Sequence, residues 1–124
     1  MDTESRTEKP VAPMLDAASF EDRVGGDEGL MREVLQLFLD GKDKALANVT
    51  EAWSRGDAKA LRAAAHYFKG EAILISAHAL RDVCLEIERK AAAGELPQAG
   101  ALLEPLKNLV AQTAQAVQGY LGKR

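Results

Sequence analysis

The sequence predicts an all-α domain, an up-down-up-down four-helix bundle with a short N-terminal helix. Ala contributes 22 and Leu 16 of the 124 residues, whereas Val, Ile and Thr together contribute 14. Ala and Leu favour helices, and strands need the β-branched residues that this chain lacks. Four amphipathic segments joined by short connections then account for the bundle. The length suits a single domain.

Composition and the terminal segments argue against several classes of protein. Residues 1–14 are polar and mixed in charge, so we expect a flexible leader before a domain at 15–124. No apolar run approaches the ~18–20 residues of a membrane span, and the N-terminus lacks the apolar segment of a secretory signal. The single Cys84 suits a reducing, cytoplasmic location. A net charge of -3 argues against a nucleic-acid partner.

Local signals delimit the first two helices. We expect Asp16 to cap a short helix through Arg23, which a Gly25-Gly26 pair ends, because a carboxylate at this position accepts backbone N–H bonds. Asp27 then caps a helix from Glu28 to about Arg55. Its predicted core positions recur at helical spacing: Leu30, Val34, Leu37, Phe38, Ala45, Val49 and Trp53.

The remaining helices follow the same logic. Gly56-Asp57 separates the second helix from a third that starts near Ala58, and Ser76 is the expected cap of a fourth that ends at Gly94. A short turn at Leu96-Pro97 leads into the last helix, with Pro105 near its first turns. The third helix carries a regular core stripe of Leu61, Ala65, Phe68, Ala72 and Ile75. The fourth buries Leu80, Val83, Cys84, Ile87 and Ala91, and the last buries Leu102, Leu106, Leu109, Val110, Val117 and Leu121.

One histidine of the third helix points away from this core. At about 100° per residue, with Leu61 at zero, the core stripe lies within about 40° of zero and His66 near 140°. The basic residues Lys59, Arg62 and Lys69 lie between about 80° and 160°. Exposed histidines and basic stripes are commonly plain surface, and His78 is interpreted in that way. Gly70 is harder to dismiss, because a mid-helix glycine costs about 0.5–1 kcal/mol relative to alanine.

The chemistry of this stripe favours phosphate. A neutral imidazole has a free ring nitrogen that can attack phosphorus, and near pH 7 an unperturbed histidine is largely neutral. A lysine three residues away is a helical-surface neighbour that can offset the charge of the phosphoryl group. The sequence has no glycine-rich phosphate loop and no Cys/His cluster with metal spacing, so we expect no metal and no cofactor in this chain.

These residues carry a family resemblance. The run from His66 to Gly70, then Ser76-Ala77 and Leu80, then Cys84 and Ile87-Glu88 resembles the histidine-containing phosphotransfer (HPt) domain. That family's pattern is roughly Ala-His-x-Leu-Lys-Gly, Gly-Ala-x-x-Leu and Cys-x-x-Leu-Glu. Residues 25–38 resemble its second helix. Phe68 replaces the usual Leu and Ser76 the usual Gly, and neither change touches His66, Lys69 or Gly70.

The resemblance implies a phosphorelay carrier. His66 would exchange a phosphoryl group with the aspartate of response-regulator receiver domains, with a hybrid sensor histidine kinase upstream. Mg²⁺ would be bound only by the receiver. Lys69 and Arg62 would stabilise the phosphate. Gly70 would allow close approach of a partner, and the docking surface would include Lys59, Ala63 and Ile73, with Val24 nearby. The carrier is not itself a kinase, and it is expected to be a monomer.

Two other function classes stay open at this point. One is a helical adaptor or regulatory bundle that binds a signalling protein and never carries phosphate. The other is an enzyme, either a fragment of a histidine kinase or a phosphohistidine phosphatase. No nucleotide-binding motif supports the kinase, and the helix pair through which such kinases dimerise would leave the last two helices unexplained. Movement of a receiver's phosphate onto this protein would distinguish the carrier from the adaptor.

Overall fold

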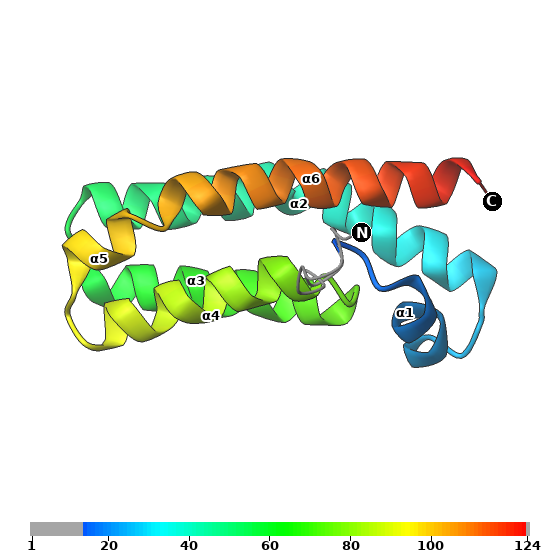
Figure 1. Ribbon diagram of the computed structural model, residues 1–124, viewed down its shortest axis with the longest axis horizontal. Helices are drawn as coiled ribbons and strands as arrows, with labels where there is room; N and C mark the ends of the chain where they lie inside the picture. Colours follow the sequence, from blue (N-terminus) through cyan, green and yellow to red (C-terminus); the bar gives the residue numbers. More distant parts are fainter. Residues whose placement is uncertain (1–13, 124) are drawn as a thin grey trace, which may run out of the picture.

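The computed structural model describes residues 14–123, which form six helices and no strand. Four long helices form an antiparallel bundle and two short ones close its ends (Figure 1). The helices are α1 (Ala17–Arg23), α2 (Glu28–Ser54), α3 (Ala58–Leu74), α4 (His78–Ala92), α5 (Leu96–Gly100) and α6 (Leu103–Gly122). The predicted four-helix bundle with a short N-terminal helix is thereby confirmed.

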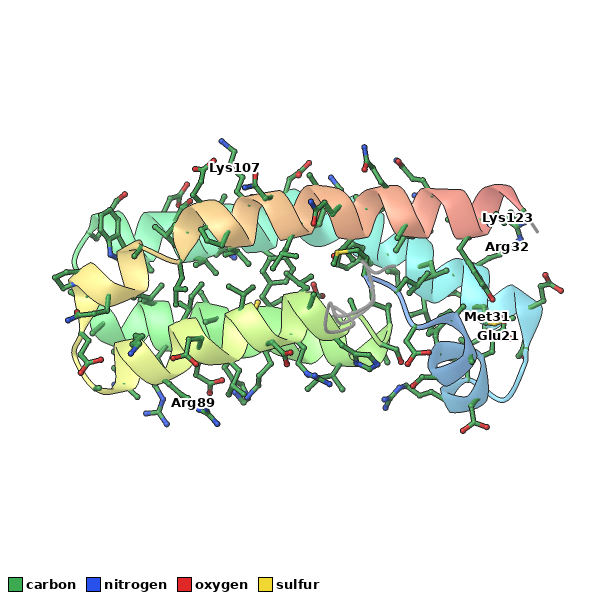
Figure 2. All side chains as sticks on the ribbon, in the orientation of Figure 1. Glu21, Met31, Arg32, Arg89, Lys107 and Lys123 are labelled. Atoms are coloured by element: carbon green, nitrogen blue, oxygen red, sulfur yellow. The ribbon has the colours of Figure 1, made fainter. Side chains whose placement is uncertain are left out.

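The bundle has two layers, α2 beside α6 and α3 beside α4 (Figure 1). The most extensive packing joins α3 to α4. Apolar side chains from both layers fill the space between them (Figure 2). Because α2 and α6 extend beyond α3 and α4, their far ends need another cover, which α1 supplies. The fully buried Phe20 of α1 meets Tyr120 of α6 edge to face, with ring centroids 6.5 Å apart.

The predicted helix starts are confirmed by their hydrogen bonds. The carboxylates of Asp16, Asp27 and Asp57 each accept from the amide three residues ahead, at 3.1, 3.0 and 2.9 Å. Each bond satisfies one of the amides that the first helical turn leaves unpaired. The predicted leader covers residues 1–14 and the predicted domain residues 15–124. Because residues 1–13 and 124 lie outside the described residues, these limits stay predictions.

The expected cap at Ser76 is wrong. Its backbone has φ 58, in the left-handed region, and the N-cap of α4 is Ala77, which has no side-chain bond. Ser76 instead ends α3: its amide donates to Ile73 O at 3.1 Å, and the Ala77 amide donates to Ala72 O at 2.9 Å. This is the pattern in which a glycine commonly ends a helix. The serine hydroxyl donates to Ser19 Oγ at 3.1 Å, which links this turn to α1.

The predicted core stripe of α2 is one residue out of phase at Leu30 and Leu37, whereas Phe38, Ala45 and Val49 are buried as predicted. Leu30 and Leu37 are 43% and 64% exposed, whereas the adjacent stripe, which begins at Met31, is buried. Two apolar stripes lie side by side on this helix, and only one can face the bundle. The buried positions of α2 are Met31, Leu35, Phe38, Ala45, Val49 and Ala52.

The expected turn at Leu96-Pro97 is the short helix α5, with the proline in its first turn, where a missing N–H costs nothing. Pro105 lies in the first turn of α6 for the same reason. Trp53 of α2 donates its Nε1–H to Leu96 O at 2.8 Å and so fixes α5 across the end of the bundle. In the described part of the chain, no helix combines the length and apolar character that crossing a membrane requires.

The contact between Trp53 and α5 leaves no room for a side chain at Gly100. A Cβ there would lie 2.5 Å from Cζ2 of Trp53, whereas a Cβ at Gly119 of α6 would meet nothing. We expect Gly100→Ala to lower the free energy of unfolding by about 1–3 kcal/mol through overpacking. Gly119→Ala should raise it by up to about 1 kcal/mol, because alanine is the better helix former. Urea unfolding measures both, and equal effects of the two variants would contradict this packing.

Candidate functional site

The side chain of His66 projects from the middle of α3 into solvent. It is 67% exposed, whereas Ala65 and Phe68 on the opposite side of the helix are fully buried. The helical phase of the core stripe places the histidine in this way, as the sequence predicted.

A hydrogen bond between helices orients the imidazole. Nδ1 of His66 lies 2.9 Å from Oε2 of Glu88 on α4. An ionised carboxylate can only accept, so Nδ1 is the donor and carries the proton. In the neutral ring, Nε2 then has no proton and its lone pair is free. The contact therefore leaves Nε2 as the ring nitrogen with a free lone pair.

Lys69 shares the same carboxylate. Its Nζ lies 2.8 Å from Oε1 of Glu88, and its side chain is only 19% exposed. Burial raises the pKa of Glu88, but the hydrogen bonds and charges of Lys69 and His66 outweigh burial, so its pKa lies below the usual value. The sequence placed Lys69 in an open basic stripe, whereas in the structure it is covered and paired.

A shallow hollow adjoins His66 on the side of α4. Its volume is about 410 Å³, and it is lined by Lys59, Arg62, Ala63, His66 and Glu88. Lys59, Arg62 and Ala63 are exposed, as predicted. The structure thus gathers four of the predicted site residues around one depression.

Gly70 and Ile73 lie beyond His66, toward the end of α3. A Cβ at Gly70 would meet no atom within 4 Å, so the missing side chain serves nothing inside the bundle. Ile73 is 39% exposed. Val24 directly follows α1 and is half-buried.

The exposed large hydrophobic side chains of the described residues all lie on α2 and α3. We call this set the apolar patch: Leu30, Leu37, Tyr67, Ile73 and Leu74. A small hollow of about 100 Å³ between α2 and α3 is lined in part by Leu37 and Leu74. Contiguous exposed apolar surface marks protein–protein interaction sites, and the shared hollow joins Leu37 of α2 to Leu74 of α3.

The second histidine differs in its surroundings. His78 is 25% exposed, and its Nε2 lies 3.0 Å from Oδ2 of Asp16. Its Nδ1 lies 3.1 Å from Nη1 of Arg81, which can only donate. Both ring nitrogens are therefore engaged, and this contact attaches α1 to α4. Hydrogen bonds from the Ser19 amide and His78 hold the pKa of Asp16 below its usual value.

Cys84 lies one turn before Glu88 on α4 and is fully buried. Burial raises the pKa of its thiol to about 12, with a contribution from the charge of Glu88. The predicted role as a small core residue fits this environment. Among residues 14–123, no group of three or more His, Cys, Asp or Glu side chains is placed to hold a metal ion.

Glu88 is the site residue that sequence reasoning missed. It appeared only as the final letter of the Cys-x-x-Leu-Glu pattern, with no role. Its signal was its position one turn after Cys84 on the edge of the buried stripe of α4. A carboxylate beside a buried stripe is costly unless it is paired, and such a residue calls for a partner on the neighbouring helix.

Comparisons with known proteins identify the family and the fold. The sequence matches the Hpt domain family over residues 33–116. The structure is similar to histidine-containing phosphotransfer protein B (HptB) from Pseudomonas aeruginosa PAO1, at 30% identity and TM-score 0.84, over 92% of this chain and 99% of that chain. It is also similar to the HPT domain from the Hpt sensor hybrid histidine kinase from Shewanella, at 16% identity and TM-score 0.79, over 90% and 96% of the two chains. No match is found among curated protein sequences.

The family match covers more than half of the chain, and the protein therefore belongs to the Hpt domain family. Its function is that of a phosphorelay carrier, as the resemblance implied. Domains of this family interact with kinases and response regulators of two-component systems.

The ion pair between Lys69 and Glu88 predicts how the pKa of Glu88 responds to the loss of the lysine. In Lys69→Met, burial of Glu88 persists while its main cation is lost, so we expect its pKa to rise, as measured by carboxyl ¹³C NMR. A carboxyl group whose pKa is lower in the folded protein stabilises the fold at pH values above its pKa in the unfolded chain. This stabilisation is lost as the pH falls through the pKa of the group in the folded protein. The acid loss of stability should therefore begin at higher pH in the variant. Lys107→Met on α6 is the control. Equal Glu88 titrations in all three proteins would contradict the ion pair.

Proposed function

We propose that His66 is the residue that carries the phosphoryl group. The observation that supports this most directly is the bond from Nδ1 to Glu88, which leaves Nε2 exposed and unprotonated. His78 lacks such a nitrogen, because Asp16 and Arg81 engage both of its own. The exchange partner is the phosphorylated aspartate of a response-regulator receiver domain.

The transfer is an in-line displacement at phosphorus. The Nε2 lone pair forms the N–P bond while the P–O bond to the receiver's aspartate breaks, and the aspartate leaves as a carboxylate. Because Nδ1 keeps its proton, the ring gains a positive charge, and the Glu88 carboxylate faces that charge. The same arrangement favours the return step, since a cationic imidazole is the better leaving group. Glu88 is thus a positioning residue for transfer in either direction.

Two cations beside the ring offset the phosphoryl charge. Arg62 lies one turn before His66 on α3 and lines the hollow beside it. Lys69 lies one turn after it and is held by Glu88. When Nε2 is phosphorylated, the dianion competes with the carboxylate for the lysine, so Lys69 contributes less than a free lysine would. Arg62 is the more available charge.

The docking surface combines the apolar patch with the open backbone at Gly70. The patch continues along α3 past the histidine through Tyr67, Ile73 and Leu74, and α2 adds Leu30 and Leu37. Gly70 lets a partner approach closely between these side chains and His66. Ala63 and Lys59 extend the surface toward the start of α3, and we assign the half-buried Val24 to it as well.

The domain itself performs no kinase reaction and needs no cofactor. The receiver supplies Mg²⁺ and the acidic residues that catalyse transfer. A hybrid sensor histidine kinase is the upstream partner, and one similar structure is the HPT domain of such a kinase. The protein acts as a monomer in the cytoplasm, with no nucleic-acid or membrane partner. The net charge of -3 supports the absence of a nucleic-acid partner.

The histidine assignment has a direct test with a matched control. His66→Gln should abolish uptake of ³²P from a phosphorylated receiver domain, because glutamine offers no nucleophilic nitrogen. Its unfolding free energy should fall by no more than about 1 kcal/mol, the value of one exposed pair such as that with Glu88. His78→Gln should retain uptake and lose stability, because it breaks the link to Asp16. Uptake that survives His66→Gln would overturn the assignment. Absence of uptake by the wild-type protein from a panel of receivers would favour the adaptor.

The role of Gly70 has a test that separates function from folding. Gly70→Gln should slow transfer by about tenfold to a hundredfold, because a crowded approach misplaces the reacting groups. It should raise the unfolding free energy by up to about 1 kcal/mol, since glycine is a poor helix residue. Gly119→Gln, in an equally open position on α6, should gain stability and keep the wild-type rate. Equal rates for the two variants would show that Gly70 has no part in docking.

A further inference from the structure

A groove runs between α3 and α4 from His66 to the end of α4. The hollow beside His66 adjoins a second hollow of about 380 Å³, lined by Ala58, Lys59, Arg62, Ala91, Ala92 and Gly94. Lys59 and Arg62 line both hollows, so the two hollows meet at these side chains. We call the two hollows together the basic groove.

Positive charge in the basic groove is not neutralised within the protein. The one acidic side chain that lines it is Glu88, which already pairs with Lys69 at 2.8 Å and contacts His66 at 2.9 Å. Neither Lys59 nor Arg62 forms an ion pair with any residue in the range 14–123. By contrast Lys90, the lysine of α4, pairs with Glu86 and Glu95.

The shape of the basic groove suits a segment of polypeptide. Its lining between the two cations and Gly94 consists of alanines, whose short side chains let a backbone approach closely. Eight residues separate Ala58 from His66, which is about 12 Å along the helix axis. An extended chain spans that length with about four residues.

We propose that the basic groove binds a short acidic segment of the receiver partner, and that Lys59 selects among receivers through it. This inference rests on the proposed function, because it places the partner's reacting aspartate at His66. Charge complementarity identifies the occupant: two unpaired cations flank a groove that offers no free acidic group. Complementary charges steer encounter and reject partners whose facing segment is basic. Lys59 lies two turns from His66, so it acts on partner choice and not on the chemical step.

Binding is tested on the full ¹⁵N-labelled chain at low ionic strength. The probe is the capped peptide Asp-Glu-Asp-Glu-Asp, with Asn-Gln-Asn-Gln-Asn as the neutral control. We expect amide shifts at residues 58–63 and 91–94 with the acidic peptide and none with the neutral one. Lys59→Glu should weaken binding of the acidic peptide about fivefold, the upper end of the effect of one screened ion pair. Lys107→Glu is the matched control, because Lys107 projects from α6 away from α3 and α4 (Figure 2).

Three outcomes of that titration overturn the inference. The first is amide shifts centred on residues outside 58–63 and 91–94. The second is an equal loss of affinity for the acidic peptide in Lys59→Glu and Lys107→Glu. The third is tighter binding of an oligothymidine of eight nucleotides at the same residues. The last would identify the basic groove as a nucleic-acid site.

Phosphotransfer kinetics separate this inference from the proposed function. With a receiver that places an acidic segment in the basic groove, Lys59→Glu should raise KM about fivefold while kcat stays unchanged. An unchanged KM with ³²P still reaching His66 refutes the groove inference alone. Peptide binding without any ³²P on His66 refutes the proposed function and leaves the anion-binding groove in place.

Discussion

The shared carboxylate of Glu88 is the interaction on which the site depends. It holds Nδ1 of His66 at 2.9 Å and Nζ of Lys69 at 2.8 Å, and so links two residues of α3 to one residue of α4. This contact sets the tautomer, leaves the lone pair of Nε2 free and restrains Lys69. A histidine with the same exposure but no such partner would divide its proton between both nitrogens.

The rest of the fold serves to hold this contact in register. His66 and Glu88 are 22 residues apart, and the tight turn at Ser76 brings their helices together as an antiparallel pair. Small buried residues, among them Ala65, Ala72 and Cys84, let the two helices approach closely. The helices α2 and α6 cover the other side of that pair, and α1 covers the exposed end. His66 therefore lies in the middle of a packed helix pair, with exposed apolar side chains of α2 and α3 on one flank and the basic hollow beside α4 on the other.

Much of the fold and the direction of His66 could be predicted from the sequence, because the sequence signals for them are local. Aspartates before apolar periodicity gave the starts of α1, α2 and α3, and the phase of the core stripe gave the direction of His66. Other features depend on tertiary packing. Two apolar stripes of α2 compete for the core, so Leu37 was misplaced. Ser76 has the chemistry of a cap, but the close approach of α3 and α4 uses it in a left-handed turn. The link between His66 and Glu88 needs the register of the two helices, which no local pattern specifies.

In the proposed function, the apolar and basic flanks of His66 recognise the receiver, and the imidazole carries out the transfer. Under that proposal, apolar contact and charge complementarity select and orient a receiver, Nε2 supplies the bond-forming electron pair, and the Glu88 contact decides whether that electron pair is available. Long-range ¹H–¹⁵N NMR of ¹⁵N-labelled protein above the titration of His66 tests this point most directly. The account predicts a protonated Nδ1 and a bare Nε2 in the wild type, with a mixture of tautomers in Glu88→Ala. A proton on Nε2 in the wild type, or the same tautomer populations in both proteins, would contradict it.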